Sequence, residues 1–405
     1  MSTVSPVSTV SSGDARQANG RREGRVLILG SSLTIMGAVM IAPVLPKLGA
    51  EFGPATAHAD LLVPLAVTGP ALAIALCAPL AGWLADRVGR KALLVVATVL
   101  YALLGVMPAL LGDLHAIVIV RLLFGAAEAA VMTCCSALIA DYWHGGERLR
   151  YINRQMVTIG LVGALFFVLG GALGEYSWRL PFLLYLLPLL LVPAMLTVLW
   201  EPTRERPGAQ APGPERVALV PVVLGYLLIF GGMVLTFIAP VQVPVVLVEM
   251  GVTSSTLIGL CAGLSLLATL GGSLAWPLML RTLKGAGTNA VLLLLFAAGL
   301  WLLNHAQSYR EVALAMLIHG LGAGLLVPNV MAPVMQALTP RTRGRGLGGL
   351  TACMYLGQFV SPLVVAALVA WAGDLRHALQ VLAVASVVAA LLWGMAAVAH
   401  RRSAP

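Results

Sequence analysis

Charge is what this sequence most clearly lacks. Only 10% of its 405 residues are charged, whereas 60% are apolar, and its mean hydropathy is +0.95. Soluble domains carry about 25% charged residues, so the composition excludes a soluble fold and indicates a protein embedded in a lipid bilayer. The net charge of +9 does not indicate a nucleic-acid partner, because the basic residues lie in short connections between apolar segments.

Metal-binding and nucleotide-binding patterns are also missing. The five cysteines lie within apolar segments and form no C-x-x-C pair, so we expect neither a disulfide nor a metal site. Glycine-rich stretches begin at Gly320 and Gly344, but neither follows a strand or carries a P-loop lysine. An enzyme would need His, Asp or Ser groups clustered at one depth, and a sensor would carry an added soluble domain. We therefore expect no enzyme and no cofactor, and transport driven by a gradient.

Long apolar segments, by contrast, are abundant. A helix of about 20 residues crosses the roughly 30 Å hydrocarbon core of a bilayer, and segments of this kind follow one another along the chain. The sequence predicts an all-α integral membrane protein with twelve transmembrane helices. The predicted spans are 26–49, 61–84, 92–112, 116–140, 155–174, 180–200, 217–247, 256–280, 286–304, 312–338, 346–371 and 378–399.

The basic residues divide unevenly between alternate connections. Of the 25 Lys and Arg residues, twenty lie on one side, four on the other, and Arg121 falls inside a span. The positive-inside rule assigns the richer side to the cytoplasm. This predicts a multi-pass protein of a bacterial inner membrane with both termini cytoplasmic. Its cytoplasmic parts would be an N-terminal tail at 1–25, a linker at 201–216 and a C-terminal tail at 401–405.

The second half of the chain repeats features of the first. The string I-A-P-V-L-P at 41–46 returns as I-A-P-V-Q-V-P at 238–244, about half the chain later. Transporters built from two homologous bundles show repeats of this kind. We therefore predict one six-helix bundle over 26–200 and a second over 217–400, in a monomer whose partners are the lipid bilayer, protons and a small-molecule substrate.

A charged hairpin separates the second and third apolar segments. Residues 82–91 read G-W-L-A-D-R-V-G-R-K, which resembles the loop 2–3 signature of the major facilitator superfamily. The resemblance covers about 26–400 and implies a cavity between two bundles that opens alternately to each side. It also implies a conformational latch, for which we expect the residues Gly82, Asp86, Arg87, Gly89, Arg90 and Asp141.

The hairpin has two expected partners. One is Asp141 at the end of the fourth span, and the other is the N-terminus of the eleventh span near Gly346, whose dipole suits the charge of Asp86. The alternative is that the hairpin only anchors the topology through its positive charge.

Two charges lie together inside the fourth span. Arg121 and Glu128 are seven residues apart, so they share one helix face at a separation of about 10 Å. The segment resembles the fourth-span motif of twelve-span drug/proton antiporters, which implicates its Arg in proton coupling. We expect both residues to couple transport to protons; the alternative is a structural ion pair. The fifth span departs from the antiporter pattern, because Phe166 and Phe167 stand where Gly-Pro would be.

Prolines break the first, seventh and tenth spans, and broken spans often line a central cavity. The residues expected to line it are Gln242, His319, Asn329, Tyr355 and Gln358. For His319 the alternative is a hydrogen-bonded packing residue. A mostly apolar cavity fits small amphiphilic compounds, so we predict their proton-coupled efflux. The alternative is proton-coupled or facilitated uptake of a specific metabolite such as an organic anion, with Arg121 as counter-ion.

Overall fold

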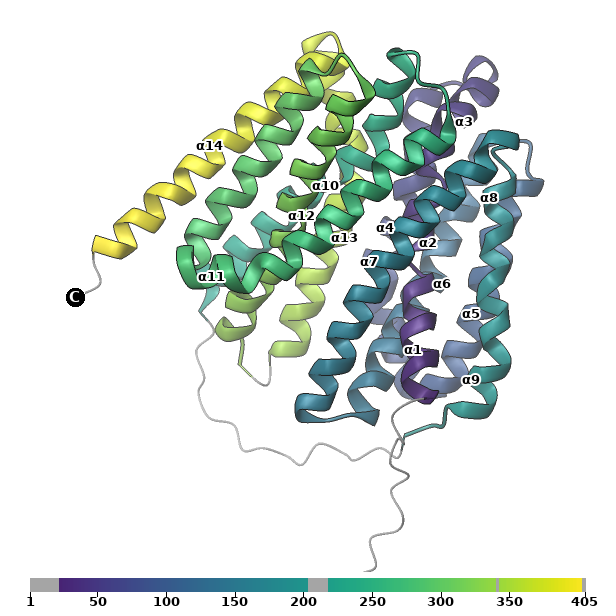
Figure 1. Cartoon of the computed structure of the whole chain (residues 1–405). Helices are drawn as coiled ribbons and strands as arrows, with labels where there is room; N and C mark the ends of the chain where they lie inside the picture. The colour runs from purple at the N-terminus through teal and green to yellow at the C-terminus, as the bar shows by residue number, and fades with distance from the viewer. Residues whose placement is uncertain (1–21, 203–217, 340–341, 403–405) are drawn as a thin grey trace, which may run out of the picture.

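The computed structural model describes residues 22–202, 218–339 and 342–402, which form helices and short connections (Figure 1). The predicted tails and linker lie almost entirely outside these ranges. The first half contains α1 (Arg22–Leu33), α2 (Met36–Val39), η1 (Ala42–Val44), α3 (Leu45–Phe52), η2 (Gly53–Ala55), α4 (Ala59–Val88), α5 (Arg90–Val106), η3 (Met107–Leu110), α6 (Leu114–Tyr142), α7 (Gly145–Tyr176), α8 (Leu180–Leu183), η4 (Leu184–Leu191) and α9 (Val192–Val198). The second half contains α10 (Leu219–Glu249), α11 (Ser255–His305), α12 (Tyr309–Ala337), α13 (Arg343–Ala372) and α14 (Leu375–Arg402).

The described part holds 11 helical segments that are long and apolar enough to cross a bilayer, and one of them is long enough to cross twice. This segment is α11, whose 51 residues would extend about 77 Å as one straight helix. Its path breaks at Lys284, where φ is 58°. The break separates two arms that match the predicted spans 256–280 and 286–304. The predicted all-α fold with twelve spans is therefore confirmed.

The first span is broken, whereas its repeat in the second half is not. It runs through α1, α2, η1 and α3, with turns at residues 34–35 and 40–41. Pro43 and Pro46 contribute to the irregular path, because proline has no N–H to donate to the preceding turn. The corresponding α10 is continuous. Breaks of this kind free carbonyl groups, which need donors from other parts of the protein when water is absent.

Buried apolar side chains form one cluster in each half, and the halves meet along two helix pairs. α7 packs against α11, and α4 packs against α13. Glycines make the first contact close: a β-carbon added to Gly263 of α11 would lie 3.2 Å from the carbonyl oxygen of Ala164 in α7. Figure 1 shows the two halves side by side, with the C-terminal end of α14 projecting from the second half.

Candidate coupling site and transport cavity

Arg121 is completely buried on α6 and donates to carbonyl groups of two other spans. Its Nε bonds the oxygen of Ala66 in α4 at 2.9 Å, and its Nη2 bonds the oxygen of Gly37 in α2. The Ala66 carbonyl is free because Pro70, four residues later, has no N–H. Gly125, one turn after Arg121, allows this approach, since an added β-carbon would lie 2.6 Å from the Cα of Pro70.

Two buried tyrosines donate to further carbonyls of the broken first span. The hydroxyl of Tyr101 in α5 donates to Leu33 at 2.9 Å, and that of Tyr185 in η4 donates to Met36 at 2.8 Å. Their rings meet edge to face with centroids 5.9 Å apart. The first span is thus held from three neighbouring helices by Arg121 and two hydroxyl groups. Sequence reasoning missed both tyrosines, because each appears as one aromatic residue in an apolar segment.

Glu128 lies two turns beyond Arg121 and packs against Gly37. Its side chain is 7% exposed, and a β-carbon added to Gly37 would lie 3.0 Å from the carboxyl carbon of Glu128. Within the described residues, Oε2 of Glu128 and Nη1 of Arg121 are buried without a hydrogen-bond partner. No ion pair joins the two side chains in this part of the chain. The guanidinium is directed to carbonyls and acts on Glu128 only through its charge, so the choice between a coupling role and a structural role for the two residues stays a prediction.

Tyr355 of α13 brings the second half of the molecule to this site. Its hydroxyl lies 3.4 Å from the sulfur of Met132, one turn after Glu128 on α6. Tyr355 is also close enough to interact electrostatically with Glu128. The carboxyl group of Glu128 therefore lies near the boundary between the halves, where a relative movement of the halves would change its contacts.

A cavity of about 160 Å³ lies between the two halves. Its lining in the first half is the broken span and α7, through Ile35, Ala38, Val39 and Phe167. The larger share of the wall comes from α10, α11 and α12 and includes Thr236, Phe237, Pro240, Ser265, Thr269, Met316, His319 and Ala323. Two of the hydroxyls are already used, because Thr236 donates to Gly232 at 2.8 Å and Thr269 donates to Ser265 at 2.9 Å. The wall therefore offers a ligand mainly apolar surface.

His319 is the one residue predicted to line the cavity that does so. Its Nε2 lies 3.2 Å from the carbonyl oxygen of Leu235 in α10, and its ring meets Phe296 with centroids 4.9 Å apart. It is thus both a packed, hydrogen-bonded residue and the ionisable side chain of the wall. Three other predicted residues are placed outside the lining, namely Gln242, Tyr355 and Gln358.

Asn329 has a structural position instead of a place in the cavity. Its Nδ2 donates to the carbonyl of Gly285 at 3.0 Å and to Oδ1 of Asn289 at 2.6 Å, and its Oδ1 accepts from Trp276 Nε1 at 3.1 Å. These bonds tie α12 to both arms of α11 beside the break at Lys284. The amide is therefore occupied in stabilising that break.

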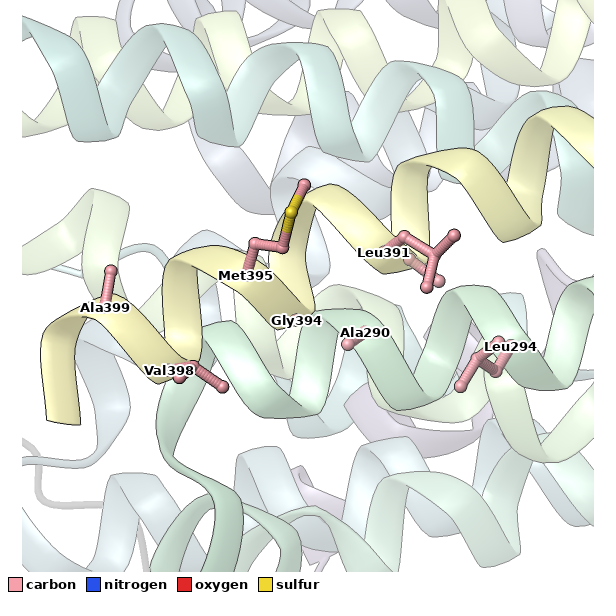
Figure 2. Close-up of a pocket in the computed structure, with 8 residues that line it drawn as sticks. Ala290, Leu294, Leu391, Gly394, Met395, Val398 and Ala399 are labelled. Atoms are coloured by element: carbon pink, nitrogen blue, oxygen red, sulfur yellow. The ribbon is translucent and has the colours of Figure 1, made fainter. Parts of the chain in front are cut away.

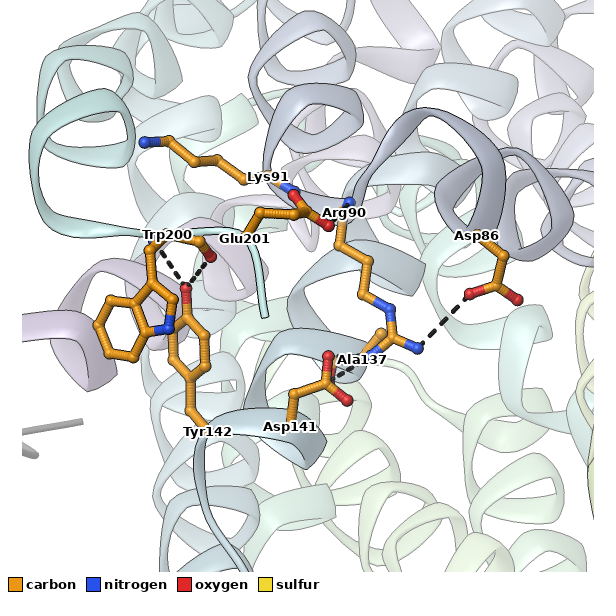
Figure 3. Close-up of polar contacts among 8 residues, drawn as sticks. All are labelled: Asp86, Arg90, Lys91, Ala137, Asp141, Tyr142, Trp200 and Glu201. Atoms are coloured by element: carbon orange, nitrogen blue, oxygen red, sulfur yellow. Dashed lines mark hydrogen bonds and ion pairs between the residues drawn. The ribbon is translucent and has the colours of Figure 1, made fainter. Parts of the chain in front are cut away.

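Three of the predicted latch residues, Asp86, Arg90 and Asp141, meet at the end of the first half that carries the linker (Figure 3). The guanidinium pairs with Asp141 of α6 and lies 3.5 Å from Asp86 of α4. The turn itself is shorter than the sequence indicates, because α4 continues to Val88 and only Gly89, with φ of 105°, separates it from α5. An expected contact between Asp86 and the N-terminus of α13 stays a prediction.

Two further predicted latch residues have local contacts. The guanidinium of Arg87 lies 4.1 Å from the ring centroid of Trp83. Gly82 faces Thr133 of α6, whose methyl group would be 3.9 Å from an added β-carbon. Both contacts fix the end of α4 to its surroundings.

Glu201 completes the hairpin network, although the sequence placed it in the linker. Its carboxylate accepts the N–H groups of Arg90 at 2.6 Å and Lys91 at 2.9 Å, and so caps the first turn of α5. Beside it, the Tyr142 hydroxyl donates to the Trp200 carbonyl at 2.6 Å, and the two rings stack at 4.2 Å. The chain that leaves the sixth span is thereby fastened to the hairpin (Figure 3).

At the opposite end, Glu175 joins the two halves. Its Oε1 accepts from the Ser254 hydroxyl and, at 2.9 Å, from the N–H of Thr256 at the start of α11. Lys47 supports the end of α7 by donating to the carbonyls of Gly174 at 2.6 Å and Glu175 at 3.0 Å. We call this group of residues the far-end contact.

A larger hollow of about 650 Å³ lies between α11 and α14 (Figure 2). Its lining consists of Ala290, Leu294, Ala390, Leu391, Gly394, Met395, Val398 and Ala399. All of these residues are apolar or glycine, and all belong to the second half. This hollow lies within one half, whereas the smaller cavity lies between the halves, where alternating access would open and close it.

Two helical halves with a cavity between them and buried charge at the depth of the bilayer define a multi-span secondary transporter, not an enzyme. The sequence profile of the Major Facilitator Superfamily matches residues 27–291 and 253–405. The chain belongs to this family.

Relatives of known name fall into two groups. The chain is 27% identical to the 3-(3-hydroxy-phenyl)propionate transporter of Escherichia coli over 299 residues, which are 71% of this chain and 73% of the relative. It is 26% identical to the multi-drug resistance efflux pump PmrA homolog of Lactococcus lactis over 347 residues, 81% of this chain and 84% of the pump. A crystal structure of a D-xylose-proton symporter has the same fold, with a TM-score of 0.76 at 18% identity over 92% of this chain and 96% of that one.

Proposed function

We propose that the protein exports small amphiphilic compounds in exchange for protons, and that Glu128 carries the proton. The observation that supports this most directly is the environment of its carboxyl group. The group is buried, Oε2 has no hydrogen-bond partner in the described residues, and the neighbouring Arg121 is directed to carbonyls. An intramembrane carboxyl without a fixed partner is typical of proton pathways.

The exchange would proceed by alternating access. Binding of a proton removes the charge of Glu128, and the altered contacts of α6 with the first span and with Tyr355 bias the halves toward one arrangement. A compound in the cavity favours the opposite arrangement, so the proton and the compound bind alternately. Because the cavity wall is mainly apolar, it fits compounds with an apolar body and few hydrogen-bonding groups.

The exchange itself sets the direction of transport, whereas the proposed orientation says which end of the protein faces the cytoplasm. The end of the first half that carries the linker also carries Arg87, Arg90 and Lys91, and the positive-inside rule places it in the cytoplasm. Protons that enter the cell down their gradient would then drive the compound outward. The name of the efflux pump among the relatives agrees with this direction.

A second candidate function is proton-coupled uptake of an aromatic carboxylate. It is favoured by the propionate transporter among the relatives and by His319, the ionisable side chain of a cavity whose lining contains no carboxylate. The two functions differ in the sign of coupling: export exchanges compound for proton, whereas uptake carries both in one direction.

Reconstituted full-length protein in liposomes can separate the two. We would impose a pH gradient of either sign and follow a quaternary ammonium dye, which has no titratable group, and 3-phenylpropionate. Exchange predicts that the dye accumulates only when the lumen is acidic. Uptake predicts that the carboxylate accumulates above the level in protein-free liposomes only when the outside is acidic. Accumulation of the dye or the carboxylate that does not depend on the sign of the pH gradient would contradict proton coupling.

A further inference from the structure

The short helix α2 has different neighbours on its two sides. On one side, Gly37 meets α6, because its carbonyl accepts from Arg121 and its Cα lies against the carboxyl group of Glu128. On the other side, Ala38 and Val39 line the cavity, together with Ile35 immediately before the helix. One four-residue segment therefore separates the proposed proton site from the proposed substrate site.

Short turns separate α2 from the helices on both sides of it. The chain turns at residues 34–35 before it and at 40–41 after it, so a displacement of α2 need not displace α1 or α3. Gly37 is a position at which α2 packs directly against Glu128. A β-carbon there would fall inside the space of the carboxyl group, so only glycine permits the contact as it stands.

We propose that Gly37 is a positioning residue that transmits the protonation state of Glu128 to the substrate cavity. The inference rests on the proposed function of Glu128 in proton coupling. A neutral carboxyl packs against the bare Cα, whereas an ionised carboxylate seeks hydrogen-bond donors and leaves that contact. Movement of α2 toward or away from α6 then changes the position of the Ala38 and Val39 side chains in the cavity wall.

The other groups around Glu128 are compatible with this role. The titratable side chains that face it are Arg121 from its own helix, Tyr101 from α5, Tyr185 from η4 and Tyr355 from α13. Three of them are already bonded to carbonyls of the first span or to α4, and Tyr355 contacts Met132. None of the four makes a hydrogen bond to Glu128 within the described residues, and Gly37 packs against its carboxyl group.

The first test compares Gly37→Ala with Gly49→Ala. Gly49 lies in the same span, and an added β-carbon there would meet nothing within 4 Å, so it controls for the change in backbone freedom. We expect Gly37→Ala to lower gradient-driven accumulation of the dye by about tenfold, within the range of typical coupling energies. It should also shift the pH dependence of dye exchange measured without a gradient. Gly49→Ala should change neither.

The second test separates positioning from packing. In a Glu128→Ala background there is no carboxyl group to displace, so adding Gly37→Ala should leave the rate of dye exchange unchanged. Gly37→Ala with Glu128→Asp should recover driven accumulation, because the shorter side chain makes room for the new methyl group. Equal effects of Gly37→Ala with and without Glu128 would overturn the inference. If Gly37→Ala does not reach the membrane, the two double variants still decide.

A wrong proposal for Gly37 and a wrong proposal for Glu128 would give different results in these experiments. If Glu128→Gln alone still drives accumulation at the original rate, the proton site lies elsewhere, and the proposal for Glu128 is wrong. If Glu128→Gln abolishes accumulation but Gly37→Ala leaves it intact, the proton site stands and the role of Gly37 is refuted.

Discussion

The two halves share one architecture and use it for different purposes. In each half, a basic side chain of the fourth span bonds a carbonyl of the first span: Arg121 with Gly37, and His319 with Leu235. His319 follows Arg121 by the same number of residues as Leu235 follows Gly37. The first half thus holds a permanent charge where the second has a group that can be neutral.

Helix packing gives a second view of the same difference. Gly320 lies against the backbone of Ser265 as Gly125 lies against that of Pro70, and these pairs are related by 195 residues along the chain, in place of the 198 residues that relate Arg121 to His319. The residue one turn before each glycine is Arg121 in the first half and Met316 in the second. In this register, which is three residues shorter, an apolar side chain stands in place of Arg121, and the carbonyl-bonded His319 lies three residues further along α12.

The same register matches Glu128 with Ala323, and the second half presents both of its apolar counterparts, Met316 and Ala323, to the cavity. In the first span, freed carbonyls accept from Tyr101, whose counterpart in this register is Phe296 with no hydroxyl. Under the proposed function, this comparison predicts a division of roles: the first half binds the proton and moves, and the second forms the larger share of the wall that contacts the substrate.

The largest effect that tests this division is expected from Arg121→Ala. It leaves the carbonyls of Gly37 and Ala66 without their donor, at about 1–3 kcal/mol each, so the variant should lose several degrees in thermal unfolding as well as driven transport. His319→Ala removes the donor from one carbonyl and should destabilise less. Equal losses of melting temperature in the two variants would break the comparison.

Glu128→Gln should have the next largest effect, on coupling and not on folding. The amide is nearly isosteric but cannot exchange a proton, so gradient-driven accumulation should fail while dye exchange without a gradient survives. Glu147→Gln, at the exposed start of α7, is the matched control and should keep both activities. Loss of both activities in Glu128→Gln, with normal unfolding, would contradict a role limited to coupling.

Charge changes in the hairpin should have moderate effects that differ in size. Arg90→Ala removes the contacts with Asp141 and Asp86 together, and the first of these is three-quarters buried. Asp86→Asn removes one pair whose acid is 64% exposed, and exposed pairs contribute about 0.2–1 kcal/mol. We therefore expect transport rates to fall several-fold in Arg90→Ala and less in Asp86→Asn. Unchanged rates in both would leave the hairpin as a topological anchor only.

Much of the fold was predictable because it depends on local sequence. About 20 apolar residues identify a span wherever it packs. The rule applies even to α11, because the sequence predicts the separate spans 256–280 and 286–304, and the helix breaks between them at Lys284. The charged string 82–91 likewise identified the hairpin. Its exact turn was not predicted, because a helix can continue to within one residue of a glycine that accepts a positive φ.

Less of the site was predictable because its bonds join side chains to distant carbonyls. Arg121 and Glu128 were recognisable as buried charges, but the pairing of Arg121 with Ala66 and Gly37 depends on which carbonyls the folded helices leave free. One signal was present: Pro70 stands four residues after Ala66 and must free its carbonyl. For Tyr101 and Glu201 no local signal exists, since each depends on an element packed against it from elsewhere in the chain.

The smallest expected effect concerns the far-end contact, where the halves meet away from the linker. Glu175→Gln keeps the shape of the side chain but weakens its bonds to Ser254 and Thr256 at the start of α11, where the helix dipole favours a negative charge. Such a contribution is about 0.3–1 kcal/mol, enough to change the populations of two states by up to about fivefold.

Glu175→Gln should therefore increase the fraction of molecules in which this end is open. A cysteine placed at Thr256 should then react faster with an impermeant thiol reagent in the Glu175→Gln variant than in a chain that keeps Glu175. Thr256→Cys keeps the backbone N–H that Glu175 accepts but removes the interaction of the Thr256 hydroxyl with the carboxylate, so the cysteine is present in every chain compared. Lys47→Met is the companion change: it leaves the carboxylate in place but removes the support of α7, and it should act in the same direction with a smaller effect. Equal labelling rates in all three backgrounds would show that packing of α7 on α11, and not charge, keeps this end closed.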